Sequence, residues 1–379
     1  MNYLTLEWKD LSARAELGIF CPPGGGLPEY HAMFHVTEAM HDTRRQYECI
    51  EAAVDRLLDE LHGVETVWKR YLVSDAVNQA AFIPREQGCA AVSVVQQPPL
   101  NGSKVALWTY MTPEGFLSAN GRATVFAHAN CRHLFHTQLH VPATGAEEQT
   151  VRIFGQYADM LEADGCTLAE HCMRTWVFVQ DIDTHYAGMV AARRACFERE
   201  GLTKDTHFIA STGIEGKHVR PGTQVFMDAY AVDGLLPGQI RYLRAPAHLN
   251  PTHEYGVTFE RGTAIQYGDR RHVFISGTAS IDHRGEIVHP SDVMKQAGRM
   301  LENIRALLDE AGAGMDDVAY MIVYLRDISD YRRIDAWLEE SCRRIPRVIV
   351  WAPVCRPGWL IEAECMAVIG AGDGRFAAF

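Results

Sequence analysis

The sequence is poor in clustered positive charge. It contains no run of five or six basic residues, and its 36 lysines and arginines are outnumbered by 48 aspartates and glutamates, which gives a net charge of −12. Binding to the phosphates of nucleic acids requires a concentrated cationic surface. We therefore expect no nucleic-acid partner.

Long apolar segments are also missing. No stretch of about 18 apolar residues is present, and the first residues, MNYLTLEWKDLSARAEL, lack the basic and apolar regions of an export signal. The sequence therefore predicts a cytoplasmic protein with no membrane partner. The ten cysteines are scattered without a CxxC pair, which favours reduced thiols over a disulfide framework.

Common cofactor and catalytic motifs are absent as well. The sequence contains no GxGxxG, GxSxG or HExxH pattern. Side chains that commonly bind zinc do gather in one segment, which contains His128, Cys131, His133, His136 and His140. On a strand this spacing divides them between both faces, because side chains alternate from one residue to the next. We therefore expect neither a metal nor another cofactor.

One helical pattern occurs three times in the chain, whose 379 residues allow two or three domains. In each copy a glutamine opens a segment with apolar residues three and four positions apart, and an apolar pair begins eleven residues after it. This spacing predicts an amphipathic helix that ends near a glycine C-cap. The three glutamines and their glycines are Gln46 and Gly63, Gln149 and Gly165, and Gln296 and Gly312.

Strands follow each predicted helix. A β-rich run closes on Asp75, Asp181 or Asp327, a second helix follows in the second and third copies, and each copy ends in two strands joined by a turn. Two helices packed on one face of a mixed or antiparallel sheet form an α+β unit. We therefore expect an α+β fold of three such units, at residues 1–113, 114–240 and 241–379.

The closing strands of the third unit carry charges that the other units lack. If these strands fold about the turn at residues 355–358, Arg347, Trp351 and Glu362 lie on one face. Aligning the strand ends of the three units sets Ala106 and Phe226 at the position of Glu362, so only the third unit has an acid there. On residue pattern alone, a structural ion pair between Arg347 and Glu362 is the alternative to a catalytic site.

Residues from about 250 to 370 resemble a known family. The segments ISGTASI, VYLRDISDY and WLIEAECMAV, with the helix that begins at Gln296, are similar to the Rid superfamily of reactive-intermediate deaminases. Rid proteins form trimers of a chorismate-mutase-like fold. The resemblance therefore implies a single-chain pseudo-trimer made of three Rid-like units, and it leaves open whether the whole chain forms a homo-oligomer.

The resemblance also implies roles for two residues. Rid deaminases place an arginine fifteen residues before a glutamate, and Arg347 and Glu362 have this spacing. In the family the arginine grips the substrate carboxylate, and the glutamate serves the water that hydrolyses an enamine or imine. Arg347 and Glu362 are therefore the candidate catalytic residues.

A second resemblance, over a longer stretch, is to chorismatases, which release pyruvate from chorismate and are also built from Rid-like units. It rests on Cys355 and Arg356 followed by the strand with Glu362, and on residues 174–216 and 254–262. It implies that Glu362 protonates an enol-ether or enamine carbon and then orients water. The further candidates for binding the substrate are Arg356, Cys355, Arg261 and Trp351.

Three functions follow as hypotheses. The first is a Rid-type enzyme that hydrolyses an enamine, imine or enol-ether bond of a small carboxylate. Chorismatase-like release of pyruvate from chorismate is the alternative. The third is a non-catalytic protein that binds a small ligand, and the presence of both Arg347 and Glu362 in one unit favours an enzyme over it.

Overall fold

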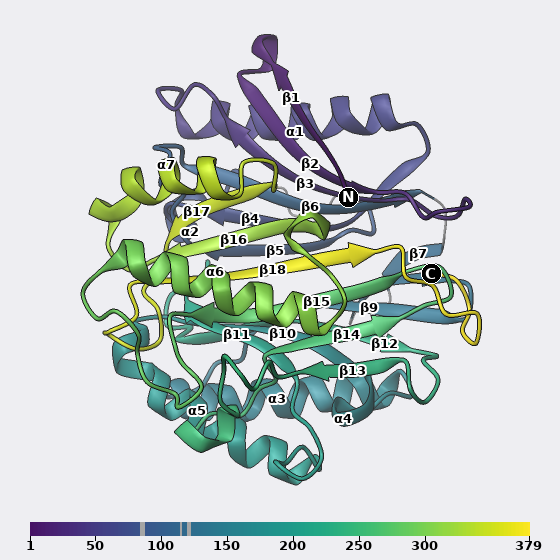
Figure 1. Cartoon of the computed structure of the whole chain (residues 1–379). Coiled ribbons are helices and arrows are strands. Elements are labelled where there is room, and N and C mark those ends of the chain that lie inside the picture. The colour runs from purple at the N-terminus through teal and green to yellow at the C-terminus, as the bar shows by residue number, and fades with distance from the viewer. Residues whose placement is uncertain (84–87, 114–115, 120–122) are drawn as a thin grey trace.

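Three six-stranded sheets follow one another along the chain (Figure 1). The structure is a computed structural model that describes residues 1–83, 88–113, 116–119 and 123–379. When the strands of each unit are counted from its first, all three sheets have the order 1-2-3-6-4-5. The prediction of three tandem α+β units of one design is confirmed.

The first unit has the longest uninterrupted edge hairpin. Its strands are β1 (Asn2–Trp8), β2 (Ala13–Phe20), β3 (Glu29–Val36), β4 (Val64–Val73), β5 (Ala91–Gln96) and β6 (Val105–Pro113). Its helices are η1 (Lys9–Leu11), α1 (Thr43–Leu61) and the single turn α2 (Ala76–Gln79).

The second unit has two long helices. Its strands are β7 (Phe116–Ala119), β8 (Thr124–His128), β9 (Cys131–Leu139), β10 (Cys172–Val179), β11 (Ala210–Glu215) and β12 (Val225–Asp233). Its helices are α3 (Ala146–Ala163), α4 (Leu168–His171) and α5 (Ile182–Arg199).

The third unit completes the chain. Its strands are β13 (Ile240–Leu243), β14 (Gly262–Gln266), β15 (Arg271–Ala279), β16 (Val318–Leu325), β17 (Arg347–Trp351) and β18 (Ile361–Ile369). Its helices are η2 (Thr252–Tyr255), α6 (Val293–Glu310), η3 (Met315–Asp317), η4 (Ile328–Asp330) and α7 (Tyr331–Ser341). No helix in the described parts of the chain is long and apolar enough to cross a membrane.

The repeated glutamine has the same structural task in each unit. The Gln46 amide oxygen accepts a hydrogen bond from the backbone N–H of Lys104, just before β6, at 2.7 Å. The oxygen of Gln149 accepts from Val225 at the start of β12, and that of Gln296 from Leu360 just before β18. A buried glutamine thus joins the first turn of each main helix to the last strand of its sheet. The glycine after each helix has a positive φ, as a C-cap requires.

The closing strands of each unit are not neighbours, which corrects the expected hairpin. In the third unit β16 lies between them, parallel to β17 and antiparallel to β18. The chain after β17 therefore crosses β16 before β18 begins. A turn signal between two strands does not show whether a third strand separates them.

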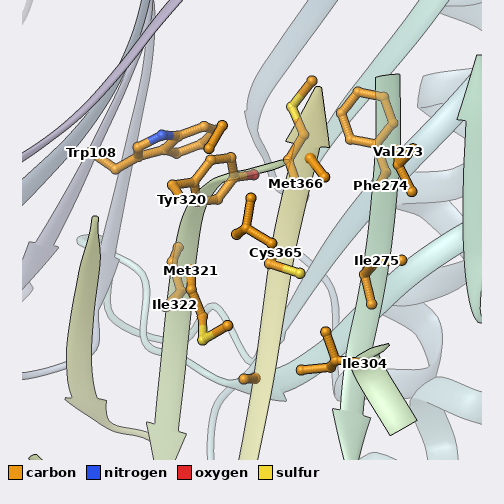
Figure 2. Close-up of a cluster of buried hydrophobic side chains, with 14 of the residues drawn as sticks. Trp108, Val273, Phe274, Ile275, Ile304, Tyr320, Met321, Ile322, Cys365 and Met366 are labelled. Atoms are coloured by element: carbon orange, nitrogen blue, oxygen red, sulfur yellow. The ribbon is translucent and has the colours of Figure 1, made fainter. Parts of the chain in front are cut away.

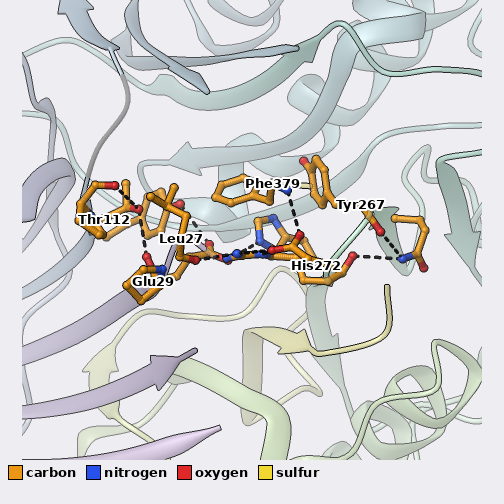
Figure 3. A network of polar contacts seen from close by, with 12 residues as sticks. Leu27, Glu29, Thr112, Tyr267, His272 and Phe379 are labelled. Carbon is orange, nitrogen blue, oxygen red and sulfur yellow. Dashed lines mark hydrogen bonds and ion pairs between the residues drawn. The ribbon is translucent and has the colours of Figure 1, made fainter. Parts of the chain in front are cut away.

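The helices lie on the outside, and the opposite faces of the sheets meet in the interior (Figure 1). Contacts link β5 to β9, β11 to β15, and β16 to β2 and β3, so each unit touches both others. Figure 2 shows Trp108 of β6 against Tyr320 of β16, with ring centroids 4.2 Å apart. A polar network also joins the first and third units, where His272 lies 2.8 Å from Glu29 (Figure 3).

Candidate functional site

A cavity of about 450 Å³ lies between the second and third units and contains the predicted acid. The second unit supplies side chains from α5 and β11, and the third supplies β15, β18, the segment before β14 and the turn before β18. The lining residues are Tyr186, Arg193, Ser211, Gly213, Tyr255, Phe259, Arg261, Gly277, Ala279, Ile281, Cys355, Trp359 and Glu362.

Glu362 lies on β18 and is only 4% exposed. Its carboxyl group fits because β15 has a glycine beside it: a Cβ at Gly277 would collide with a Glu362 oxygen. Burial, and next the charge of Glu364, raise the pKa of Glu362 to about 8, against the opposing effect of Arg174 and Arg261. Glu362 therefore holds a proton near neutral pH and is able to act as a general acid.

Two buried arginines line the cavity without a carboxylate partner among the described residues. Arg193, from α5, is 2% exposed, and its Nε has no hydrogen-bond partner. Arg261 donates from Nη2 to the backbone oxygen of Asn250 at 3.1 Å and to its side-chain oxygen at 3.2 Å, while its Nε is also unpartnered. Unpaired guanidinium groups suit the carboxylates of a ligand.

The other predicted binding residues have different surroundings. Cys355 lines the cavity, and burial raises its pKa to about 12, so it is a neutral thiol rather than a nucleophilic thiolate. Arg356 does not line the cavity but donates to the backbone oxygen of Tyr255 at 3.2 Å. Trp351 is also outside it, and its indole N–H donates to the backbone oxygen of Arg326.

Arg347 does not lie beside Glu362, and the expected shared face is wrong. Glu362 pairs with Tyr324, and Tyr324 pairs with Val350, so these three side chains share one face of the sheet. Arg347 is three residues from Val350 and faces the other side, because side chains alternate along a strand. The expectation failed because it assumed that β17 and β18 were adjacent.

The surroundings of Arg347 belong to a different interface. Its guanidinium pairs with Glu339 of α7 and donates to the backbone oxygen of Cys342 at 3.1 Å. Its backbone N–H donates to Glu16 of the first unit at 3.1 Å. The position of β11 that corresponds to Arg347 is Ser211, and this serine lines the cavity that holds Glu362.

The residues that sequence reasoning missed come mainly from the second unit. Tyr186 and Arg193 are on α5, and Gly213 is on β11. Both elements fall within residues 174–216, which resemble a chorismatase, and that resemblance was the available signal. An arginine on a helix is usually exposed at its charged end, so nothing in the local sequence around Arg193 shows that it is buried.

The histidine-rich segment that could suggest zinc does not form a metal cluster in the described residues. His133 lies 2.8 Å from the hydroxyl of Tyr230, and His140 lies 2.7 Å from the backbone oxygen of Gln138. Three other residues that suit a metal, Cys166, His171 and Asp233, have atoms within 4.8 Å of one another.

Their hydrogen bonds, however, disfavour a metal. The backbone N–H of Thr167 donates to Nδ1 of His171, so the proton of the neutral ring is on Nε2, the atom that faces Asp233. Arg132 donates to Asp233 at 2.8 Å and supplies the positive charge that a metal would bring.

Comparisons with known proteins identify relatives of the third unit. A family model described as Endoribonuclease L-PSP matches residues 262–369. A RutC family protein of Pyrococcus abyssi is 41% identical over 107 residues, which are 27% of this chain and 82% of that protein. The 3-aminoacrylate deaminase RutC of Acinetobacter baylyi is 32% identical over 97 residues, 25% of this chain and 77% of that protein.

The similarity to a solved structure extends further along the chain. A crystal structure of a chorismatase has a TM-score of 0.63 and 17% sequence identity, over 80% of this chain and 92% of that one. At this identity the likeness shows a shared fold. The sequence matches identify the family as well. Through its third unit the chain belongs to the Rid family, which is also described as the Endoribonuclease L-PSP and RutC family.

Proposed function

We propose that the protein is an enzyme that hydrolyses an enol-ether, enamine or imine bond next to a carboxylate, in the cavity that contains Glu362. The observation that carries this proposal is a buried carboxyl group that holds its proton near neutral pH and faces a cavity. Two unpaired arginines in the same cavity support it, because they match the charge of a small carboxylate substrate.

The reaction needs one acid and one water molecule. Glu362 transfers its proton to the terminal carbon of the C=C bond, which leaves a positive charge shared by the adjacent carbon and its oxygen or nitrogen. Water adds to that carbon and gives a proton back to the Glu362 carboxylate. The adduct then breaks its C–O or C–N bond: its new hydroxyl group becomes the carbonyl, and the proton of that hydroxyl goes to the leaving alcohol or ammonia, which yields a keto acid and leaves Glu362 protonated as at the start.

A second, narrower candidate is release of pyruvate from chorismate. Chorismate carries two carboxylates, and the cavity has two guanidinium groups, Arg193 and Arg261, without carboxylate partners in the described chain. The fold similarity to a chorismatase, which spans all but a fifth of the chain, points the same way. The deamination of 3-aminoacrylate belongs to a relative that matches a quarter of the chain, and it supports the enamine reaction.

The test compares wild type with Glu362→Gln, which keeps the side-chain shape and removes the acid. Pyruvate release from chorismate and ammonia release from freshly generated 2-aminoacrylate are measured for both. Turnover of the accepted substrate should fall by about 10²–10⁴ while the fold, followed by circular dichroism, is retained. Glu339→Gln is the matched control, since Glu339 pairs with Arg347 outside the cavity, and it should retain wild-type turnover.

Two results would contradict the proposal. Full activity in Glu362→Gln would remove the acid role. If the wild type is inactive on both substrates but binds chorismate, and Arg193→Ala weakens this binding, the result would favour the non-catalytic binding protein.

A further inference from the structure

A cluster of four buried charges lies in the interior and draws on all three units. Arg70 of β4 donates to Asp228 of β12 at 2.9 Å, and Arg174 of β10 donates to Glu364 of β18 at 2.9 Å. Arg70 also lies 3.9 Å from Glu364, which joins the two pairs into one cluster. Each of the four side chains is at most 2% exposed. Two positive and two negative charges balance, as burial requires.

Polar and aromatic groups hold this cluster in place. The indole N–H of Trp176 donates to Glu364 at 2.7 Å, and the hydroxyl of Ser93 donates to Asp228. The guanidinium of Arg70 lies 4.4 Å from the centre of the Trp176 ring, and 5.3 and 5.5 Å from the ring centres of Trp68 and Trp108, within the range of a cation–π contact. The position of Glu364 is therefore determined by residues of the first and second units.

Two links connect the cluster to the cavity. Glu364 and Glu362 are two residues apart on β18, so both point to the same face of the sheet. Arg174 also donates to the hydroxyl of Thr212 at 2.5 Å, and that hydroxyl accepts the backbone N–H of Gly277 at 2.9 Å. Gly277 is the residue whose missing side chain makes room for Glu362.

We propose that Glu364, held by Arg70 and Arg174, is a positioning residue that keeps Glu362 in its proton-donating form. This inference rests on the proposed function of Glu362. It gives the first unit a part in the reaction, although none of the described residues of that unit lines the cavity.

The other groups around Glu362 do not have this effect. The charged or titratable side chains that face it are Glu364 on β18, Tyr324 on β16, Arg174 on β10, Arg261 before β14, Tyr186 and Arg193 on α5, Tyr255 on η2, and Cys355 in the turn before β18. Arg174 and Arg261 favour an ionised Glu362. Burial raises the pKa of the cysteine and of the tyrosines, so these groups are neutral. Glu364 is the one carboxylate among them, and its charge opposes ionisation of Glu362.

The test replaces Glu364 by glutamine, which keeps its shape and removes its charge. Infrared difference spectra against Glu362→Gln isolate the carboxylic-acid band of Glu362, which is followed as the pH rises. In Glu364→Gln this band should disappear about one pH unit lower than in the wild type, and the fall in kcat at high pH should move by the same amount.

Two further variants test the contribution of the other units. Asp228→Asn leaves the charge of Arg70 uncompensated near Glu364, so it should shift the titration of Glu362 in the same direction by a smaller amount. The double variant Arg70→Gln/Asp228→Asn removes a complete ion pair and leaves no charge unpaired, so it should shift the titration less than Asp228→Asn does. Glu339→Gln should leave it unchanged.

An unchanged titration of Glu362 in Glu364→Gln would overturn the inference, as would a kcat reduced equally at every pH. The infrared readout does not depend on turnover, so it separates this failure from that of the proposed function. If the band moves while the pH dependence of kcat does not, Glu362 is not the acid, and the catalytic role of Glu364 fails with it.

Discussion

The interface between the second and third units and the interface between the third and first units are built from corresponding elements but carry different charged side chains. The cavity between the second and third units uses Ser211 and Gly213 of β11, and a cavity of about 370 Å³ between the third and first units uses Arg347 and Ile349 at the corresponding positions of β17. Arg193 on α5 corresponds to Glu339 on α7, since Arg193 lies twelve residues after Asp181 and Glu339 twelve residues after Asp327, the aspartates that end the preceding β-rich runs.

The difference lies in which charges are already paired. In the third-to-first cavity Arg347 meets Glu339, and Arg14 lies 3.0 Å from Glu16, so both arginines are neutralised within the protein. The register places Ala106 at the position of Glu362. A site that binds a carboxylate needs guanidinium groups that are not already paired with a carboxylate of the protein. Of the two cavities, the one with Arg193 and Arg261 meets this condition in the described chain.

Among the tests of this comparison, the largest effect is expected from filling the space beside the acid. Gly277→Ala places a methyl group against a Glu362 oxygen, so the carboxyl group must move, and turnover should fall by about 10–10³-fold. Gly298→Ala is the control, because a Cβ at that position of α6 meets nothing within 4 Å. Steady-state kinetics on the accepted substrate checks both variants, and equal activity in the two would remove the steric argument.

A pair of arginine variants tests the comparison directly. Arg193→Lys keeps the charge but loses the two-pronged hydrogen bonding, so KM should rise by about 10-fold. Arg347→Lys, which the resemblance to Rid deaminases predicts to weaken substrate binding, should leave KM unchanged because Arg347 pairs with Glu339. The reverse result would restore Arg347 to the substrate site.

The stability of the protein should respond to the buried acid. The pKa of Glu362 is about 8 in the folded chain, above its ordinary value of 4.5, so between these pH values the unfolded chain has released a proton that the folded chain keeps. The wild type should therefore lose stability relative to Glu362→Gln as the pH rises from 4.5 to 8, by about 2–4 kcal/mol. Urea unfolding of both proteins across this range measures the difference, and parallel curves would show that Glu362 titrates normally.

The smallest expected effect concerns RNA binding, which is tested because the matching family is described as an endoribonuclease. With a net charge of −12, the chain should show no RNA binding that weakens as salt increases. A filter-binding titration at low and high salt checks this. Tight, salt-dependent binding would mean that one of the interfaces presents a cationic surface that the net charge conceals.

Much of the fold was accessible from local patterns. The glutamine-led helices, their glycine ends and the β-rich runs appear where the periodicity predicts them, because capping and amphipathic burial depend on residues close in sequence. The alignment of Ala106 and Phe226 with Glu362 agrees with the strand register, in which the three occupy corresponding positions. The location of the acid on the third unit followed from this alignment.

The composition of the site was less accessible. Arg347 and Glu362 have the fifteen-residue spacing of the family, but the two side chains face opposite sides of the sheet, in which β16 separates their strands. Arg193 and Gly277 belong to the site because the second and third units pack against each other, and the sequence of either unit does not show this contact. Arg356 and Trp351, close to the acid in sequence, donate to backbone oxygens and are not among the residues that line the cavity.

The sequence by itself determined three α+β units, their main helices and the single unit with an acid on its last strand, since these depend on periodicity and on residues within one repeat. Only the tertiary structure decided which arginines line the cavity with Glu362, and that the buried charge of Glu364 lies on the same face of the sheet. Strand order sets the face on which each side chain emerges, and the contact between units decides which charges are paired and buried. Both are long-range properties, so spacing along the chain does not encode them locally.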